Sequence, residues 1–323
     1  MNTPKCTLQL YTNFLIGTQK QYSGMELSKV SPQNMAHDAV NRWLAEELLT
    51  PKKVWQNIRD KIDKGTGCLC IDDSLLDKPY SKKISLAKYQ YSGKHHGVAK
   101  GIDIVNMIWT NGEQKLPVDY RVYEPTFDGK TKNDHAQEML SSAKKRGFSP
   151  QYVLMDSWFS SVKNLQTVKN YNWKWITEFK CNRKISLIKG QYLQIQALDW
   201  TQKRVYKVWL KEYGFILVTK TVAPNGDVAY LATNDLTLDS EELIRDHYSK
   251  RWDIEVFHRD IKQCCGIEKC YSCLQRSQRN HILCSFLAFI KLEMYKIKLK
   301  ISCYEVKWSI IRPAVSNFLA STP

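Results

Sequence analysis

No apolar run in this 323-residue chain approaches the roughly 20 residues that a membrane-spanning helix requires. The first residues also lack the pattern of a secretory signal peptide. We therefore expect a cytoplasmic protein whose ten cysteines are reduced thiols. The chain has no internal repeats and no low-complexity linker, and 43% of its residues are apolar, so an ordinary globular protein with one large core or two modest ones is expected.

Acidic residues are scarce relative to basic ones. The chain has 32 Asp and Glu against 48 Lys and Arg, which gives a formal net charge of +16. The excess is concentrated in residues 78–100 and 174–220, where Tyr and Trp alternate with the basic residues. Basic stretches interleaved with aromatics are typical of surfaces that follow a nucleic-acid backbone, although a merely soluble basic protein is the alternative.

The most informative stretch is residues 248–262. If it is an α-helix, Tyr248, Arg251, Glu255 and Lys262 fall within roughly 60° of arc, because their spacings nearly complete whole turns. A separate apolar stripe would pack the helix against the core and so determine the direction in which the polar face points. The stripe consists of Ile254, Phe257, Ile261 and Cys265. On spacing alone, ordinary i,i+4 ion pairs on a solvated helix are the favoured interpretation.

The spacing Tyr248-x2-Arg251-x3-Glu255-x6-Lys262 resembles the signature of bacterial insertion-sequence DDE transposases of the "IS four" type. The resemblance implies that Glu255 is the third metal-binding carboxylate and that the Tyr, Arg and Lys grip DNA phosphates. The neighbouring DNA-binding candidates are Trp252 and Arg259. Trp252 would border the catalytic face and support an unpaired base, with a simple packing role as the alternative.

Two further carboxylates must then lie upstream. Residues 68–74 and 152–156 are apolar runs that end in acid, as in buried strands that deliver a carboxylate. The second run supplies Asp156. In the first run the resembled family selects the Asp before Ser74, which is Asp73, while Asp72 remains the alternative. The expected catalytic and metal-binding set is therefore Asp73, Asp156 and Glu255.

The order of elements predicts an α/β fold. After a helical region over residues 1–62, an Asn111-Gly112 type I′ hairpin joins two strands, and helices and strands alternate up to about residue 179. This order resembles the ribonuclease H-like mixed-sheet core of DDE enzymes. A β-rich insertion about residues 181–233 precedes the last helices. We expect two parts, an N-terminal helical region (1–62) for DNA-end binding or bracing and a catalytic domain (63–323).

The resemblance implies a transposase that cleaves insertion-sequence ends and joins the 3′-hydroxyls to target DNA. Three carboxylates suit two Mg²⁺ ions, with Mn²⁺ as a substitute. The expected partners are double-stranded DNA, as element ends and target, and a second copy of the chain in a synaptic homodimer associated with the nucleoid. The alternatives are a ribonuclease H-like nuclease without strand transfer and a DNA-binding protein with an inactive site.

Two other groups of residues need an interpretation. Cysteines crowd residues 264–273, so a structural zinc site competes with the interpretation that they are small core residues. Acids outside the catalytic set are expected to be surface charge; they include Asp103, Asp119, Glu124 and Asp128.

Overall fold

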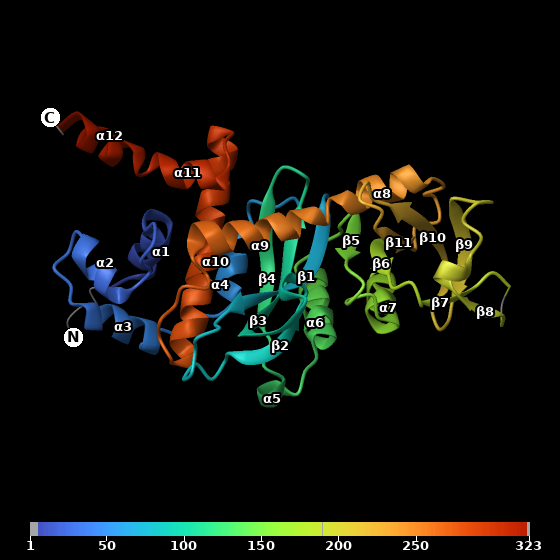
Figure 1. Ribbon diagram of the computed structural model, residues 1–323, viewed down its shortest axis with the longest axis horizontal. Coiled ribbons are helices and arrows are strands. Elements are labelled where there is room, and N and C mark those ends of the chain that lie inside the picture. The colour runs from blue at the N-terminus through green and yellow to red at the C-terminus, as the bar shows by residue number, and fades with distance from the viewer. Residues whose placement is uncertain (1–5, 189, 322–323) are drawn as a thin grey trace.

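The computed structural model describes residues 6–188 and 190–321. Figure 1 shows the helices α1 to α3 beside α10 at one end, the strands β1 to β4 in the middle, and the strands β7 to β11 at the other end. Within the described residues, eleven strands form one mixed sheet in the order β2-β3-β1-β5-β6-β11-β10-β9-β7-β8, with β4 paired to β3.

The strand β1 is central to the fold. It pairs antiparallel with β3 and parallel with β5, and both apolar runs predicted as strands are buried on both faces. Buried parallel strands are typically continuous in apolar residues, which is why these runs were identifiable. The central strands are β1 (Cys68–Asp77), β2 (Lys88–Ser92), β3 (Gly97–Thr110), β4 (Lys115–Val122), β5 (Tyr152–Met155) and β6 (Trp175–Phe179).

The predicted hairpin is present as β3 and β4, but its turn differs from the prediction. Thr110 pairs with Lys115, so the connection has four residues and is not a two-residue type I′ turn. The side-chain oxygen of Asn111 accepts hydrogen bonds from the backbone N–H groups of Glu113 and Gln114, and Gly112 has a φ of 97°. Asn and Gly thus mark the reversal through an Asx turn.

The predicted alternation of strands and helices up to β6 agrees with the structure, apart from the additional strand β2 before the hairpin. The predicted β-rich insertion extends the sheet, because β11 pairs antiparallel with β6. Its strands are β7 (Lys184–Ser186), β8 (Tyr192–Gln194), β9 (Val205–Leu210), β10 (Gly214–Val222) and β11 (Val228–Thr233).

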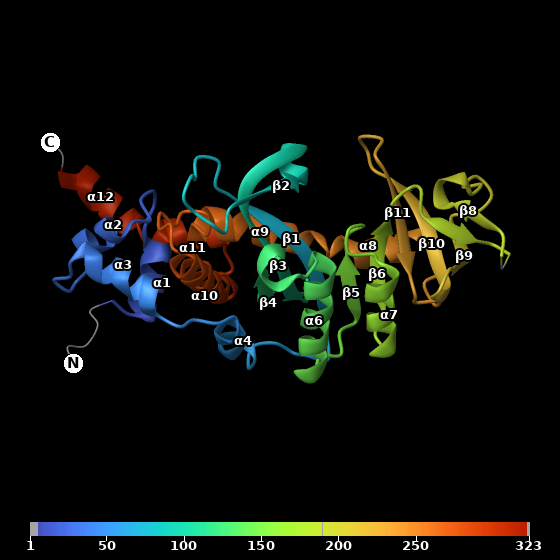
Figure 2. The ribbon, with the colours of Figure 1, turned by 90° about the horizontal axis from the view of Figure 1, so that it is seen from below.

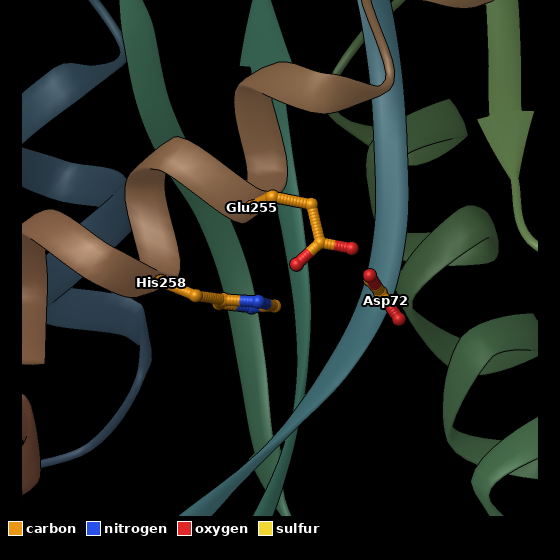
Figure 3. Close-up of side chains that lie close together, drawn as sticks. All are labelled: Asp72, Glu255 and His258. Carbon is orange, nitrogen blue, oxygen red and sulfur yellow. The ribbon is translucent and has the colours of Figure 1, made fainter. Parts of the chain in front are cut away.

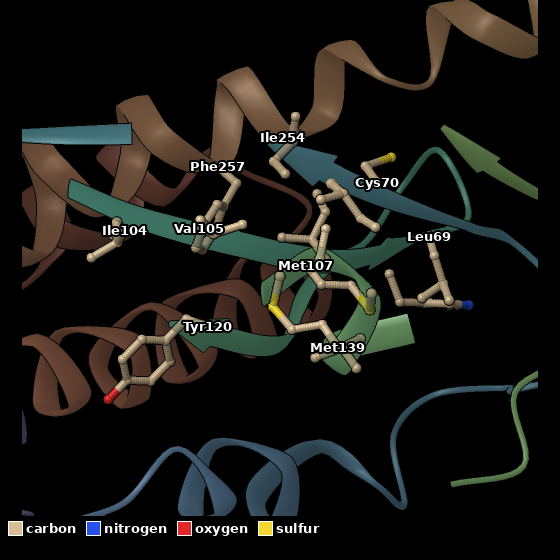
Figure 4. Packing of buried hydrophobic residues seen from close by; sticks show 14 of the residues in the cluster. Leu69, Cys70, Ile104, Val105, Met107, Tyr120, Met139, Ile254 and Phe257 are labelled. Atoms are coloured by element: carbon tan, nitrogen blue, oxygen red, sulfur yellow. The ribbon is translucent and has the colours of Figure 1, made fainter. Parts of the chain in front are cut away.

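Helices cover both faces of the central strands. Figure 2 shows α6 (Lys132–Lys145) and α7 (Val162–Asn170) side by side, away from β2. On the other face lies α9 (Trp252–Cys265), whose Ile254 and Phe257 are fully buried. In Figure 4 these two side chains lie on one side of β3, and Met139 of α6 lies with Met107 on the other side. The active-site strands are therefore held between α6 and α9.

The N-terminal helices pack against α10, and one apolar core extends from Cys6 to Val306. The side chain of Asn280 on α10 donates hydrogen bonds to the carbonyls of Leu44 and Glu47. The expected division near residue 62 thus lies within a continuous core. The remaining helices are α1 (Leu8–Gly17), α2 (Gly24–Val30), α3 (His37–Glu46), α4 (Lys52–Ile58), α5 (Pro125–Asp128), α8 (Glu241–Ser249), α10 (Gln275–Leu299), α11 (Cys303–Ser309) and α12 (Arg312–Ser321). None of the described helices is long and apolar enough to cross a membrane.

The prediction of one continuous helix over residues 248–262 is wrong. Helix α8 ends at Ser249 and α9 begins at Trp252, with Lys250 and Arg251 between them. The backbone stays in the αR region there, but tighter i→i+3 hydrogen bonds replace the α-helical ones: the N–H of Arg251 donates to Tyr248 and that of Asp253 donates to Lys250. The break falls within the predicted motif, between Tyr248 and Glu255.

Candidate active site

The adjacent aspartates of β1 face opposite sides of the sheet, as alternation along a strand requires. Asp72 faces α9, where its Oδ2 lies 3.3 Å from Nη1 of Arg251. Asp73 faces α6, where its Oδ2 lies 2.8 Å from Nζ of Lys132. Glu255 lies on α9, so it shares the face of Asp72. We expected Asp73 to be the partner of Glu255, but in the structure the alternative, Asp72, faces Glu255.

Asp156 follows the last residue of β5, next to β1. Because Ile71 is in register with Met155, Asp72 and Asp156 lie at the same level along the two neighbouring parallel strands. The Oδ1 of Asp156 accepts hydrogen bonds from the backbone N–H groups of Trp158 and Phe159, at 3.0 and 3.2 Å. These bonds fix the carboxylate at the end of the strand.

Glu255 and His258 lie one turn apart on α9 and approach Asp72. Figure 3 shows Glu255 and Asp72 directed toward one another, with the His258 ring beside them. One potential ligand atom from each of the three residues lies within 4.8 Å of the other two. The Nε2 of His258 lies 2.9 Å from the side-chain amide of Asn106, which is the cross-strand partner of Asp72.

The electrostatics of this cluster disfavour negative charge. Burial, followed by the charge of Asp156, raises the pKa of Asp72 well above its ordinary value, although Arg251 opposes the shift. Burial also raises the pKa of Asp156, with the charge of Asp73 adding to it. Burial, assisted by Lys262 and Arg251, lowers the pKa of His258 to about 3, so its imidazole is neutral. A bound cation would relieve the carboxylates and leave the imidazole able to coordinate.

A cavity of about 1480 Å³ opens over these residues. Its wall includes the acids Asp72, Asp73, Asp156, Glu178 and Glu255 and the basic residues Lys88, Lys132, Arg251, Arg259 and Lys262. The structure therefore brings all three expected carboxylates to one cavity, together with the alternative Asp72.

The predicted DNA-binding residues divide into two groups. Arg251, Arg259 and Lys262 line the cavity, where Nζ of Lys262 donates to the carbonyl of Leu75 at 2.7 Å. Tyr248 instead directs its hydroxyl to the carbonyl of Met155, at 3.1 Å. Tyr248 thus contacts the end of β5, while its ring stays beside Arg251, whose guanidinium lies 5.8 Å from the ring centroid.

Trp252 is 64% exposed and is not among the residues that form the described cavity wall. The aromatic side chains on that wall belong to Tyr89, Tyr91 and Trp158 among others. Trp252 was expected to border the catalytic face, but it does not line the described cavity.

Several acids expected at the surface are buried, so that prediction is wrong for them. Asp103 is 1% exposed and shares Lys132 with Asp73, and burial raises its pKa to about 6. Asp119 pairs with Arg121, and Glu124 with Arg279. Their ion pairs could not be predicted, because Lys132 and Arg279 are far away in the sequence and no motif links Asp119 to Arg121. The alternation of residues along β3 and β4 also does not show which charged side chains are buried. Asp128 is exposed, as predicted.

His258 and Trp158 are site residues that the sequence reasoning did not assign. A usable signal existed for His258, because residues three apart on a helix share a face and Glu255 was already a candidate. Trp158 is two residues beyond Asp156. No sequence pattern could place Lys132 and Asn106 at the site, because strand register and helix packing bring them there.

Within the described residues, the cysteines of 264–273 are not grouped closely enough to share a metal ion. Among the described side chains, those grouped closely enough to share an ion are Asp72, Glu255 and His258. Cys264 and Cys265 are buried in the apolar core, and burial raises the pKa of Cys264 to about 11. Both therefore occupy the place of small core residues, as the second interpretation expected.

Comparison with known proteins identifies the family of this chain. No curated protein matches the chain. Among solved structures, a chain of the Drosophila P element transposase strand transfer complex is 11% identical, with a TM-score of 0.31, over 60% of this chain and 48% of that one. The chain spans about half of that protein's length, and so low a TM-score establishes no common fold. A family described as "Transposase DDE domain" matches residues 63–290, most of the chain. This chain therefore belongs to the transposase DDE domain family.

Proposed function

We propose that this transposase cleaves the ends of an insertion sequence and joins their 3′-hydroxyls to target DNA by metal-dependent phosphoryl transfer. The observation that carries the proposal is the convergence of Asp72, Asp156 and Glu255 on one cavity whose wall also holds Arg251, Arg259 and Lys262. Carboxylates that bind cations, beside basic groups that bind phosphates, are what phosphoryl transfer on DNA requires.

The residues present suit a pair of Mg²⁺ ions, for which Mn²⁺ could substitute. Mg²⁺ prefers oxygen ligands and needs few of them from protein. Burial and like charge raise the pKa of Asp72 and Asp156, a penalty that a divalent cation would remove. Asp72, Asp156 and Glu255 would hold the ions, with His258 at the edge of the group. When bound, two ions stabilise the attacking and leaving oxygens of a displacement at phosphorus.

Asp72 is the proposed first carboxylate because it faces Glu255, whereas Asp73 is engaged by Lys132. Asp73 would act from the opposite face by holding Lys132 and Asp103 in place. This assignment departs from the family resemblance, which selected the residue before Ser74.

Arg251 and two basic residues of α9 would bind the DNA backbone. Arg251 lies between two carboxylates, and a cation there would free its guanidinium for bidentate contact with phosphate. Arg259 and Lys262 lie on α9 at the cavity wall and would bind the distorted end, including the hairpin intermediate that the resemblance implies. Tyr248 would act indirectly, by fixing the strand end that presents Asp156.

The finer assignment rests on the four-residue signature. We propose membership of the "IS four" type, a ribonuclease H-like core with its insertion, and an N-terminal helical region that supports binding of the element ends. Double-stranded DNA would be bound by a homodimer in a synaptic complex at the nucleoid.

The test uses duplex oligonucleotides that carry the inverted repeats flanking the gene. The wild-type chain with Mg²⁺ should nick the end and join it to a target duplex, with the products separated on a denaturing gel. Asp156→Asn and Glu255→Gln should lose both steps, and the exposed Asp60→Asn should lose neither. Nicking without joining would identify a nuclease, and binding without nicking would identify a DNA-binding protein with an inactive site.

A further inference from the structure

The edge strand β2 presents two tyrosines to the active-site cavity. Tyr89 and Tyr91 are 72% and 67% exposed, and both line the cavity that holds the carboxylates. Two residues apart on one strand, they lie on the same face. Figure 2 shows β2 at one side of the molecule, away from α6 and α7. Large aromatics this exposed, gathered at one cavity, suggest a binding surface.

The charge around these tyrosines favours a polyanion. Lys88 precedes Tyr89 on the strand and also lines the cavity, and Nζ of Lys100 lies 5.4 Å from the centroid of the Tyr89 ring. Lys100 is the cross-strand partner of Tyr89. Aromatic rings flanked by lysines are the elements of a single-stranded nucleic-acid site, in which bases stack while the basic groups follow the phosphates.

The spacing of the two side chains fits nucleobases. Alternate residues of a strand are about 6.6 Å apart, and successive bases along a DNA strand are about 3.4 Å apart. Two tyrosines on one face therefore span about two base steps, which leaves room for a base between the rings or beside each one.

We propose that Tyr89 and Tyr91 form a stacking site for unpaired bases of the DNA end that enters the active site. The proposal rests on the function proposed above and assigns to β2 the aromatic support that the sequence suggested for Trp252. The proposed hairpin intermediate requires a sharp reversal of the strand, which unstacks a nucleotide, and stacking on tyrosine would compensate the lost base-base contacts.

The experiment measures binding of a duplex with a single-stranded tail that contains 2-aminopurine, without divalent metal so that no cleavage occurs. Stacking on a tyrosine quenches the fluorescence of this base. We expect wild type, Tyr89→Phe and Tyr91→Phe to quench it. Tyr89→Ala and Tyr91→Ala should lose the quenching and about five- to a hundredfold in affinity for tailed DNA, while binding of a blunt duplex is unchanged.

Tyr304→Ala, which removes an exposed tyrosine on α11, is the matched control and should behave as wild type. Full quenching in the Tyr89→Ala/Tyr91→Ala double variant would overturn the proposal. An equal loss of affinity for tailed and blunt DNA would also overturn the proposal. So would a changed oligomeric state with the quenching intact, which would indicate a protein interface on β2. Because no cleavage is needed, the result is independent of the strand-transfer assay: a chain that joins no DNA but shows the quenching refutes only the proposed function.

Discussion

Arg251 lies between Asp72 and Glu255, with its Nη1 3.3 Å from Oδ2 of the aspartate and 3.4 Å from Oε1 of the glutamate. The guanidinium therefore occupies the space where the account places a metal ion, and it neutralises two carboxylates that are otherwise crowded. This relationship selects Asp72 over Asp73 as the partner of Glu255. It leads to the first prediction.

Asp72→Asn should abolish DNA cleavage, with a loss of more than about a hundredfold, because it removes a metal ligand. Asp73→Asn should retain measurable cleavage, since that side chain faces Lys132. DNA affinity should be unchanged or higher in both variants, as removing a negative charge cannot weaken a phosphate contact. The comparison is a gel assay of nicking beside a binding titration. Retained cleavage in Asp72→Asn together with its loss in Asp73→Asn would reverse the assignment.

Lys132 should stabilise the fold through two acids at once. Its Nζ lies 2.8 Å from Asp73 and pairs with the buried Asp103. Lys132→Met would leave the charge of Asp103 buried without a partner, a change that costs about 3 to 5 kcal/mol in comparable buried pairs. Adding Asp103→Asn should restore much of this loss, which urea unfolding of the two single variants and the double variant can measure. Simple additivity of the two substitutions would refute the coupling.

The stability of the protein should depend on Asp103 between about pH 4 and 6. Burial, together with the charge of Asp73, raises the folded-state pKa of this residue to about 6, whereas an unfolded Asp titrates near 3.9. Between these values the folded state binds more protons than the unfolded state, so this contribution to stability is fully present at low pH and is lost as pH rises to 6. The loss should be on the order of 3 kcal/mol.

Asp103→Asn should remove this part of the pH dependence, while Asp60→Asn should leave it. The free energy of unfolding, measured from pH 4 to 7 on the three proteins, gives the comparison. An unchanged slope in Asp103→Asn would show that the residue does not titrate in this range.

His258 should support metal binding as a neutral group. Its pKa of about 3 keeps the imidazole uncharged above pH 5, so it can act as a ligand or orient one. His258→Ala should weaken Mn²⁺ binding by about ten- to a hundredfold, the usual effect of removing such a group. The exposed His96→Ala is the control. Equal Mn²⁺ affinity in His258→Ala and wild type, measured by calorimetry, would exclude this role.

The sequence was informative where local patterns determine position. The two apolar runs that end in acidic residues predicted β1 and β5. Strands buried on both faces consist of consecutive apolar residues, which can be recognised in the sequence. Periodicity also identified the apolar stripe of α9. It could not reveal the break before Trp252, because Lys250 and Arg251 are good helix formers. The burial of Asp103 and its pairing with Lys132 depend on contacts between distant segments, which no local pattern records.

The choice between Asp72 and Asp73 shows the same limit. Alternation correctly predicts that adjacent residues face opposite sides of the sheet, but it does not say which side faces α9. That orientation follows from the packing of Ile254 and Phe257 on β1 and β3, which only the folded chain displays.

Metal binding by the proposed carboxylates can be measured with Mn²⁺, monitored by electron paramagnetic resonance. The proteins to compare are wild type, Asp72→Asn, Asp73→Asn, Asp156→Asn and Glu255→Gln. The account predicts that wild type and Asp73→Asn bind the ion, and that the other three variants lose at least tenfold in affinity. Wild type that binds no Mn²⁺, or Asp72→Asn that binds as wild type while Asp73→Asn does not, would contradict the account.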